Sequence, residues 1–105
     1  MRRGDVHRLR VPKGLGHEPR NARYGVIVQA DALLPRSVVL VAPTSASARA
    51  ASFRPVIGVR GGTTRVLVEQ LGAVDVSRLG DRVTSLAAEE LSDVDDALRT
   101  VLALG

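Results

Sequence analysis

Two side chains that suit phosphate chemistry stand beside apolar runs of this chain. Arg23 directly precedes the run at residues 24–28, and Thr44 follows the run at residues 38–42, with Pro43 between them. If the two runs are neighbouring strands, a guanidinium and a hydroxyl meet at one end of a sheet. A planar guanidinium donates two parallel hydrogen bonds to phosphate oxygens and stays charged at any working pH. The pair therefore predicts a small phosphate-handling site.

The elements that would position these groups can be read from apolar periodicity. Runs rich in β-branched residues predict buried strands, and Gly61-Gly62 predicts a two-residue type I′ hairpin turn. Apolar residues from Leu91 to Leu102 fall on one stripe of an amphipathic helix. The expected strands are residues 6–11, 24–30, 37–42, 55–60, 63–68 and 82–86, with a helical turn at 74–79, a helix at 88–103, and loops at 12–22 and 45–52.

The composition predicts a single domain over residues 1–105 with an aliphatic core, because Tyr24 and Phe53 are the only aromatic residues. No run approaches the roughly twenty apolar residues that a membrane span needs, and the basic start lacks the apolar stretch of a signal peptide. We therefore expect a cytoplasmic protein without a membrane association. The lack of cysteine excludes disulfides, thiolate metal sites and cysteine nucleophiles.

The charge is unevenly divided along the chain. Residues 1–68 carry 12 of the 15 basic side chains and 3 of the 11 acidic ones, whereas residues 69–105 carry 3 and 8. A basic body with an acidic end suits a polyanionic ligand on one face. The alternative is that the many arginines reflect a biased genome and solvate the strand faces.

Metal chemistry finds no support in the residue spacing. His7 and His17 are ten residues apart, and no third carboxylate stands at ligand spacing. Residues 60–63 lack the lysine and the following helix of a phosphate-binding loop. We expect no metal and no other cofactor.

Four short motifs, in order, resemble the MazF/PemK family of toxin endoribonucleases. Residues 3–6 read Arg-Gly-Asp-Val, the loop at 16–23 ends in Arg23, residues 43–45 read Pro-Thr-Ser, and Glu69 is followed by Gln70. The family pattern is R-G-D/E-[VI], then G-S-E and a later R-P, then P-x-T-S, then [LV]-x-[ED]-Q. No single motif is specific, but the ordered set covers the chain from Arg3 to Leu104.

This resemblance implies a fold, an activity and partners. The fold would be mainly β with a C-terminal helix, the small half-open SH3-like barrel of the MazF, Kid and CcdB toxins, assembled as a homodimer. The activity would be that of a type II toxin, a metal-independent, sequence-specific endoribonuclease that cuts single-stranded RNA to 2′,3′-cyclic phosphate and 5′-OH ends. The target could be mRNA, tRNA or rRNA. The partner would be a cognate MazE-like antitoxin with an acidic disordered tail.

The resemblance also implies roles for individual residues. Arg23 and Thr44 would be catalytic, and the family pattern also gives the arginine a proton-transfer role. Because an arginine side chain remains protonated, it is a poor base, and electrostatic stabilisation of the phosphorane is the sounder role. The resemblance implies that the substrate-binding residues are His17, Glu18, Ser45, Arg49, Glu69 and Gln70.

Several of these roles have a competing interpretation. Arg23 could form a strand-edge ion pair with Glu18 or Asp5, and Thr44 could only shape the turn after Pro43. Gln70 could satisfy backbone groups instead of reading a base. His17 stands where the family usually has serine, and Tyr24 where it usually has proline, so base specificity and any catalytic part for the histidine stay open.

Two other functions compete with an endoribonuclease. One is a non-enzymatic CcdB-like toxin that binds DNA gyrase through a C-terminal Trp-Gly-Ile, but this chain contains no tryptophan. The other is an SH3-like nucleic-acid-binding module without catalysis.

Overall fold

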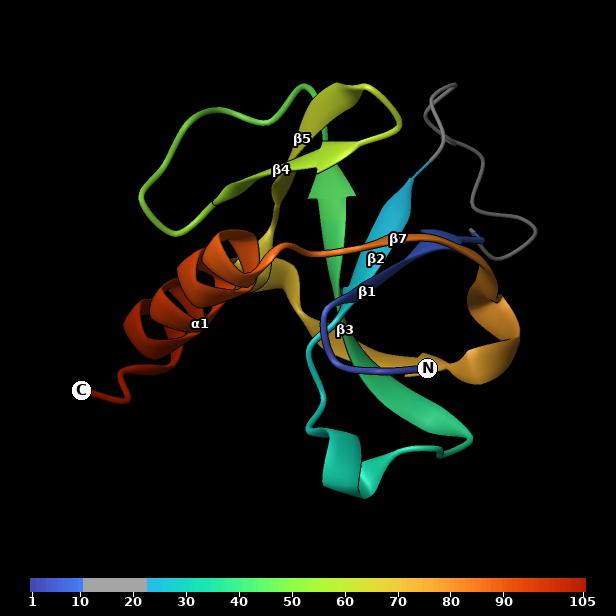
Figure 1. The fold of residues 1–105 in the computed structure, drawn as a ribbon. Helices are drawn as coiled ribbons and strands as arrows, with labels where there is room; N and C mark the ends of the chain where they lie inside the picture. The colour runs from blue at the N-terminus through green and yellow to red at the C-terminus, as the bar shows by residue number, and fades with distance from the viewer. Residues whose placement is uncertain (11–22) are drawn as a thin grey trace.

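A computed structural model describes residues 1–10 and 23–105, which form a strongly curled antiparallel sheet with one long helix against it (Figure 1). The prediction of a mainly β protein with a C-terminal helix is confirmed. The elements in chain order are β1 (Asp5–Leu9), β2 (Tyr24–Ile27), η1 (Asp31–Leu33), β3 (Val38–Ser45), β4 (Val56–Val59), β5 (Gly62–Val66), η2 (Val68–Gln70), β6 (Gly72–Asp75), η3 (Val76–Arg78), β7 (Leu79–Ser85) and α1 (Ala88–Leu102).

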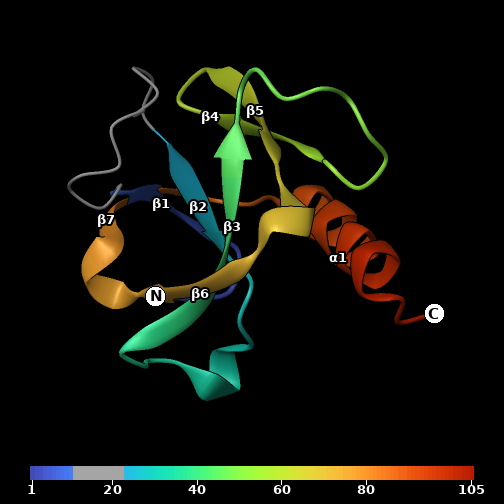
Figure 2. The same cartoon turned by 180° about the vertical axis from the view of Figure 1, so that it is seen from behind.

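Strand β3 is the centre of the sheet, whose order is β4-β5-β3-β2-β1-β7 with β6 also paired to β3. The first half of β3 pairs with β6, its middle pairs with β2, and its last residues, Thr44 and Ser45, pair with β5. Figure 2 shows β3 running between these partners, with β6 and β5 following one another along it. The end of β3 therefore lies at the junction of two parts of the sheet.

Apolar side chains fill both sides of the curled sheet. Because successive side chains of a strand point to opposite faces, Val26 and Ile27 of β2 enter different clusters. The larger cluster lies between the sheet and α1 and includes Val6, Val26, Ile57, Val68 and Val94. The smaller one contains Ile27, Val39, Val41 and Val74. Among residues 1–10 and 23–105, the largest fully buried side chains are all valine or isoleucine, as the aliphatic composition predicts.

The helix α1 packs its apolar stripe onto the larger cluster and is fixed at its start by Glu90. Val94 and Ala97 are buried on this stripe. One carboxylate oxygen of Glu90 accepts a hydrogen bond from the Ala87 N–H at 2.8 Å, and the other accepts from the Gly58 N–H at 2.8 Å. Glu90, the third residue of the helix, thus satisfies the backbone N–H of Ala87 just before the helix, as in half of a capping box, and ties α1 to β4.

The N-terminal Arg-Gly-Asp-Val motif also serves the architecture. Gly4 has a φ of +91°, and Asp5 is 5% exposed, with its carboxylate accepting from the Arg2 N–H at 2.9 Å and the Ser85 hydroxyl at 2.7 Å. The Arg3 guanidinium pairs with Asp95 of α1 at 2.7 Å. The motif therefore fastens β1 to β7 and to the helix.

The structure adds two unpredicted 3-10 turns, η1 and η2, begins β7 at Leu79 and not at residue 82, and differs from the expected elements in three further places. β6 was not predicted, because residues 72–75 are few and lie before the helical turn η3, which falls within the expected turn at 74–79. The hairpin turn uses Arg60 and Gly61, with φ of 50° and 78°, whereas Gly62 already pairs with Val59. β3 runs on to Ser45, so Thr44 lies inside a strand and not in a turn after it.

Candidate active site

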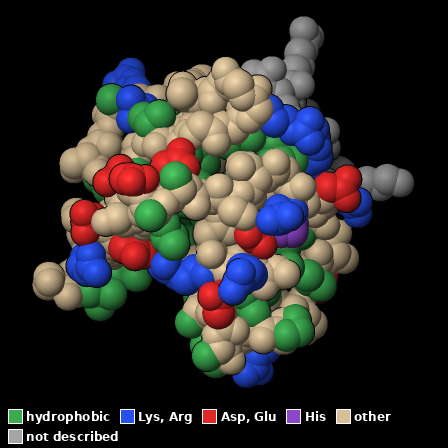
Figure 3. All heavy atoms as spheres, in the orientation of Figure 1, with side chains coloured by type: hydrophobic (Ala, Val, Ile, Leu, Met, Phe, Trp, Pro, Cys, Tyr) green, Lys and Arg blue, Asp and Glu red, His purple; other side chains and the backbone are tan. Residues whose placement is uncertain are grey.

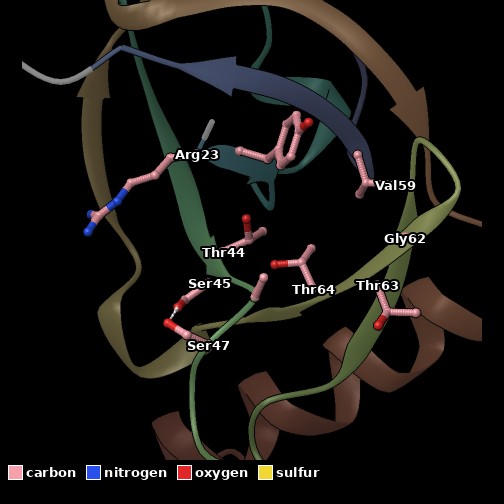
Figure 4. Close-up of a pocket in the computed structure, with 10 residues that line it drawn as sticks. Arg23, Thr44, Ser45, Ser47, Val59, Gly62, Thr63 and Thr64 are labelled. Atoms are coloured by element: carbon pink, nitrogen blue, oxygen red, sulfur yellow. Dashed lines mark hydrogen bonds between the residues drawn. The ribbon is translucent and has the colours of Figure 1, made fainter. Parts of the chain in front are cut away.

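A pocket of about 450 Å³ opens where β2 begins and β3 ends, beside the hairpin of β4 and β5 (Figure 4). Pairing of β3 with both β2 and β5 brings these three segments together. Arg23 and Thr44, the predicted catalytic pair, both line it, as does Ser45. The full lining is Arg23, Tyr24, Thr44, Ser45, Ala46, Ser47, Val59, Gly62, Thr63 and Thr64.

Strand register sets how Arg23 and Thr44 share the pocket. Gly25 pairs with Pro43, so continuing the ladder places Tyr24 opposite Thr44 and Arg23 opposite Ser45. Neighbouring positions of a strand point to opposite faces. In agreement, the Arg23 guanidinium points away from Thr44 (Figure 4). The two residues border one pocket, and a turn of the long, exposed arginine side chain is needed to bring its charge over a ligand held by Thr44.

Thr44 and Thr64 present hydroxyl groups from the inner wall of the pocket. They are 3% and 8% exposed, and their side chains lie next to one another in Figure 4. Thr44 pairs with Val66, so Thr64 occupies the diagonal position on the same face of the neighbouring strand. Sequence reasoning missed Thr64, because its place beside Thr44 depends on the register of strands twenty residues apart.

Tyr24 gives the pocket its aromatic wall. The Arg8 guanidinium carbon lies 6.0 Å from the centre of the Tyr24 ring, so β1 supplies a cation to the ring that borders the pocket. Gly25 follows with no room for a side chain, since a Cβ there would lie 2.5 Å from Val41. This close approach of β2 to β3 keeps the tyrosine next to Thr44.

Three of the predicted substrate-binding residues do not line the pocket. Glu69 forms an ion pair with Arg54, whose Nη2 and Nε lie 2.6 and 2.8 Å from the same Oε2. These hydrogen bonds from Arg54 are the main reason that the pKa of Glu69 is lowered. Gln70 is exposed at the end of η2, and Arg49 is exposed on the chain that joins β3 to β4.

His17 and Glu18 lie outside the described residues. The alternative pairing of Arg23 with Asp5 is wrong, because the Asp5 carboxylate, at the first residue of β1, accepts from the Arg2 N–H and the Ser85 hydroxyl. His7 lies on β1, where its Nδ1 is 2.9 Å from the Gly80 carbonyl oxygen. In residues 1–10 and 23–105, no group of three or more His, Asp or Glu side chains could hold a metal ion.

The charges on the surface divide as the sequence indicates. Asp and Glu side chains gather over α1, whereas Arg side chains are spread over this face, with one group of them at the end of the sheet where β2 begins (Figure 3). A positive charge at the mouth of a pocket lined with hydroxyl groups suits an anionic ligand.

Residues 2–102 match the family described as the PemK-like, MazF-like toxin of type II toxin-antitoxin systems. The chain belongs to this toxin family. It is also 38% identical over 104 residues to the toxin candidate Rv3098A of Mycobacterium tuberculosis strain H37Rv, with 97% of each chain covered.

Solved structures show the same fold at low sequence identity. An endoribonuclease from a mycobacterial species, solved with its cognate antitoxin, has a TM-score of 0.80 and 20% identity, covering 100% of this chain and 97% of its own. The M. tuberculosis toxin MazF-mt6 has a TM-score of 0.78 and 17% identity, covering 96% and 98%. A chain of a MazE–MazF complex from Deinococcus radiodurans has a TM-score of 0.78 and 18% identity, and the match covers 100% of this chain and 97% of that chain. The predicted MazF-like half-barrel is thus confirmed. Across the described part of the toxin-family chain, no helix is long and apolar enough to span a bilayer.

Proposed function

We propose that this toxin-family protein is a metal-independent endoribonuclease that cuts single-stranded RNA at the pocket between β2 and β3. The observation that carries the proposal is that Arg23 and Thr44 border one pocket at the end of the sheet. Family membership supports it, and so do the structural neighbours that are named endoribonucleases.

The chemistry follows from RNA itself. The 2′-oxygen attacks the adjacent phosphorus, the bond from phosphorus to the 5′-oxygen breaks, and a 2′,3′-cyclic phosphate and a 5′-OH result. One proton leaves the 2′-OH, one is delivered to the departing 5′-oxygen, and no water or metal is consumed. The protein must stabilise the extra negative charge of the phosphorane. Donors held in place before the reaction do this most effectively.

Arg23 and Thr44 divide this task. The Thr44 hydroxyl is fixed in a buried strand position and donates a hydrogen bond to a phosphate oxygen. Arg23 is exposed at the rim, and its side chain turns over the bound phosphate to donate two hydrogen bonds to the equatorial oxygens. Because the additional negative charge develops only in the transition state, Arg23 contributes more to the cleavage rate than to RNA affinity.

The proposal extends to partners. The basic end of the sheet would be covered by an acidic, disordered antitoxin segment that folds on binding. The MazE–MazF complexes of D. radiodurans give a precedent for such a partner in the family. We further propose that the protein acts in the cytoplasm, where both RNA and antitoxin are present.

The first prediction tests the site. Arg23→Ala should lower the single-turnover cleavage rate about a hundredfold or more and change RNA affinity far less, because the arginine stabilises the transition state. Thr44→Ala should lower the rate less. The measurement is cleavage of a long RNA in EDTA, with the ends of the products identified.

Two variants serve as controls. Arg23→Lys keeps the charge but cannot give two parallel hydrogen bonds, so it should recover only part of the rate. Arg36→Ala removes an exposed arginine between η1 and β3, which donates to the Leu33 carbonyl, and should cleave as the unaltered protein does. Cleavage by Arg23→Ala at the full rate would refute the site, and no cleavage by the unaltered protein would refute the activity.

A further inference from the structure

Arg54 is the best-connected side chain of the loop that joins β3 to β4, residues 46–55, here called the β3–β4 loop. It donates two hydrogen bonds to Oε2 of Glu69, at 2.6 and 2.8 Å, and a third to the Arg49 carbonyl oxygen at 3.2 Å. Its guanidinium carbon also lies 5.8 Å from the centre of the Phe53 ring, which packs against the larger core cluster. One side chain thus ties the middle of the loop to its end.

Glu69 is a firm anchor for this connection. It lies on η2, between Val68, which is fully buried, and Gln70, whose N–H donates to the Leu67 carbonyl oxygen at 2.9 Å. The Leu67 N–H in turn donates to the Pro43 carbonyl oxygen at 2.8 Å, so η2 is bound to the strand that carries Thr44. Only a quarter of the Glu69 side chain is exposed, and hydrogen bonds to a charged group are stronger than neutral ones.

The other end of the β3–β4 loop forms a wall of the pocket. Ala46 and Ser47 line it, and the Ser47 hydroxyl lies 3.3 Å from that of Ser45 (Figure 4). Few contacts hold this stretch directly, since Ala46 and Ser47 are both exposed. Its position therefore depends on how the rest of the loop is held.

We propose that Arg54 and Glu69 are positioning residues that hold the β3–β4 loop so that Ser45 to Ser47 form one wall of the RNA pocket. The role of the pair in cleavage rests on the proposed endoribonuclease function, whereas its hold on the loop does not. Glu69 acts through Arg54, at a distance from the RNA, and this differs from the direct base contact that the family resemblance implies for the acid-glutamine pair.

The experiment uses the full chain and two readouts. Native-state digestion with trypsin measures opening of the loop through the rate of cleavage after Arg49, identified by fragment mass. RNA cleavage gives KM, kcat and the preferred motif. The variants are Glu69→Gln, which keeps the shape and removes the charge, Arg54→Met, and the two combined. Asp96→Asn is the matched control, because it breaks the Arg99–Asp96 ion pair on the exposed face of α1.

Glu69→Gln and Arg54→Met should each raise the rate of tryptic cleavage after Arg49 about tenfold or more, because loss of a charged hydrogen bond favours local opening. Each should raise KM about three- to tenfold, since the RNA must then order the loop, and leave kcat and the motif nearly unchanged. The double variant should resemble the single ones, because both break one connection. Asp96→Asn should change none of these values.

Two results would overturn the proposal. The first is cleavage after Arg49 at the unaltered rate in Glu69→Gln, which would show that the pair does not hold the loop. The second is a change of the preferred RNA motif in Glu69→Gln, together with an increase in KM in the double variant beyond that of Arg54→Met alone. This result would show that Glu69 contacts the RNA itself. If the unaltered protein cuts no RNA, the proposed function fails, and the digestion still decides whether the pair holds the loop.

Discussion

Thr44 offers a donor whose surroundings are already free of most water. The residue is 3% exposed, so a phosphate oxygen that meets the hydroxyl replaces few water contacts of the protein. Hydrogen bonds in a water-poor site are stronger than in bulk solvent, and the fixed strand position costs no reorganisation at the moment of reaction. Arg23 has the opposite character, since it is exposed and must be ordered by the ligand. The site thus combines one fixed donor with one mobile charge.

Two carboxylates make stability depend on pH. Hydrogen bonds from Arg54 lower the pKa of Glu69. Burial acts to raise the pKa of Asp5, but the Ser85 hydroxyl, the Arg2 N–H and the charge of Arg82 outweigh it, and the net shift is downward. A group whose pKa is lower in the folded state stabilises the fold above its unfolded pKa. We therefore predict that these two carboxylates make a constant contribution to the free energy of unfolding above about pH 5. This contribution is lost as the pH falls through the pKa values that the two groups have in the folded protein.

Urea unfolding between pH 3 and 7 measures this dependence. Glu69→Gln should be less stable near neutral pH and should lose less stability in acid than the unaltered protein, because its pair no longer titrates. Asp96→Asn again serves as the comparison, since the carboxylate it removes is exposed. If the free energy of unfolding depended on pH in the same way in Glu69→Gln and in the unaltered protein, Glu69 would not be a source of the acid sensitivity.

At the scale of elements, α1 ends in a residue that is poorly suited to its backbone. Ala103 has a φ of 55°, and the Leu104 N–H closes the helix by donating to the Arg99 carbonyl oxygen at 2.9 Å. This left-handed position is the one that glycine usually fills. Ala103→Gly should therefore raise the free energy of unfolding by about 0.5–1 kcal/mol.

Chemical denaturation of Ala103→Gly beside Ala88→Gly tests the argument. Ala88 is the first residue of the same helix, where glycine only adds freedom to the unfolded chain, so this variant should be less stable by up to about 1 kcal/mol. Equal losses of stability in both variants would show that the closing turn is unstrained.

The pattern of apolar residues predicts an element well where the pattern is complete within one segment of the chain. The runs at residues 24–30 and 37–42 became β2 and β3, and the stripe from Leu91 to Leu102 became α1. β6 escaped prediction because its four residues become a strand only when β3 supplies the partner. Its sequence has too few residues for a period to show. The turn shifted from Gly61-Gly62 to Arg60-Gly61 because the ladder pairs Gly62 with Val59.

The candidate site was predictable to the same degree. Arg23 and Thr44 flank apolar runs, so their meeting at one end of the sheet could be expected. The faces to which they point follow from the register of β2 against β3, which no local pattern determines. Likewise, Glu69 accepts a hydrogen bond from Arg54, fifteen residues earlier in the chain. Only the folded loop shows that this carboxylate already has a partner.

At the scale of the whole molecule, the core is small and apolar residues remain at the surface. Val38 and Leu40 of β3 are 47% and 40% exposed, and Leu33 is 51% exposed. A chain of this size buries only about two-thirds of its unfolded surface. We therefore predict a homodimer, in which a second copy covers apolar surface that one chain leaves open.

Sedimentation at micromolar concentration measures the assembly. The expected mass is twice the 11.1 kDa of the chain. Leu40→Asp should shift the distribution toward the monomer if the exposed part of β3 lies in the interface, whereas Thr100→Asp on the exposed face of α1 should leave it unchanged. A stable monomer that still cuts RNA would contradict the prediction.

The pairing of β1 with β7 has a consequence for synthesis on the ribosome. Asp5 pairs with Ser85, and Val6 of β1 shares its core cluster with Val94 and Ala97 of α1. The helix follows every strand in the sequence, so this cluster can close only after α1 has been translated. A nascent toxin built in this order has no finished core to hold its pocket. If it cuts RNA as proposed, we expect the message being read to be spared by the chain still attached to it.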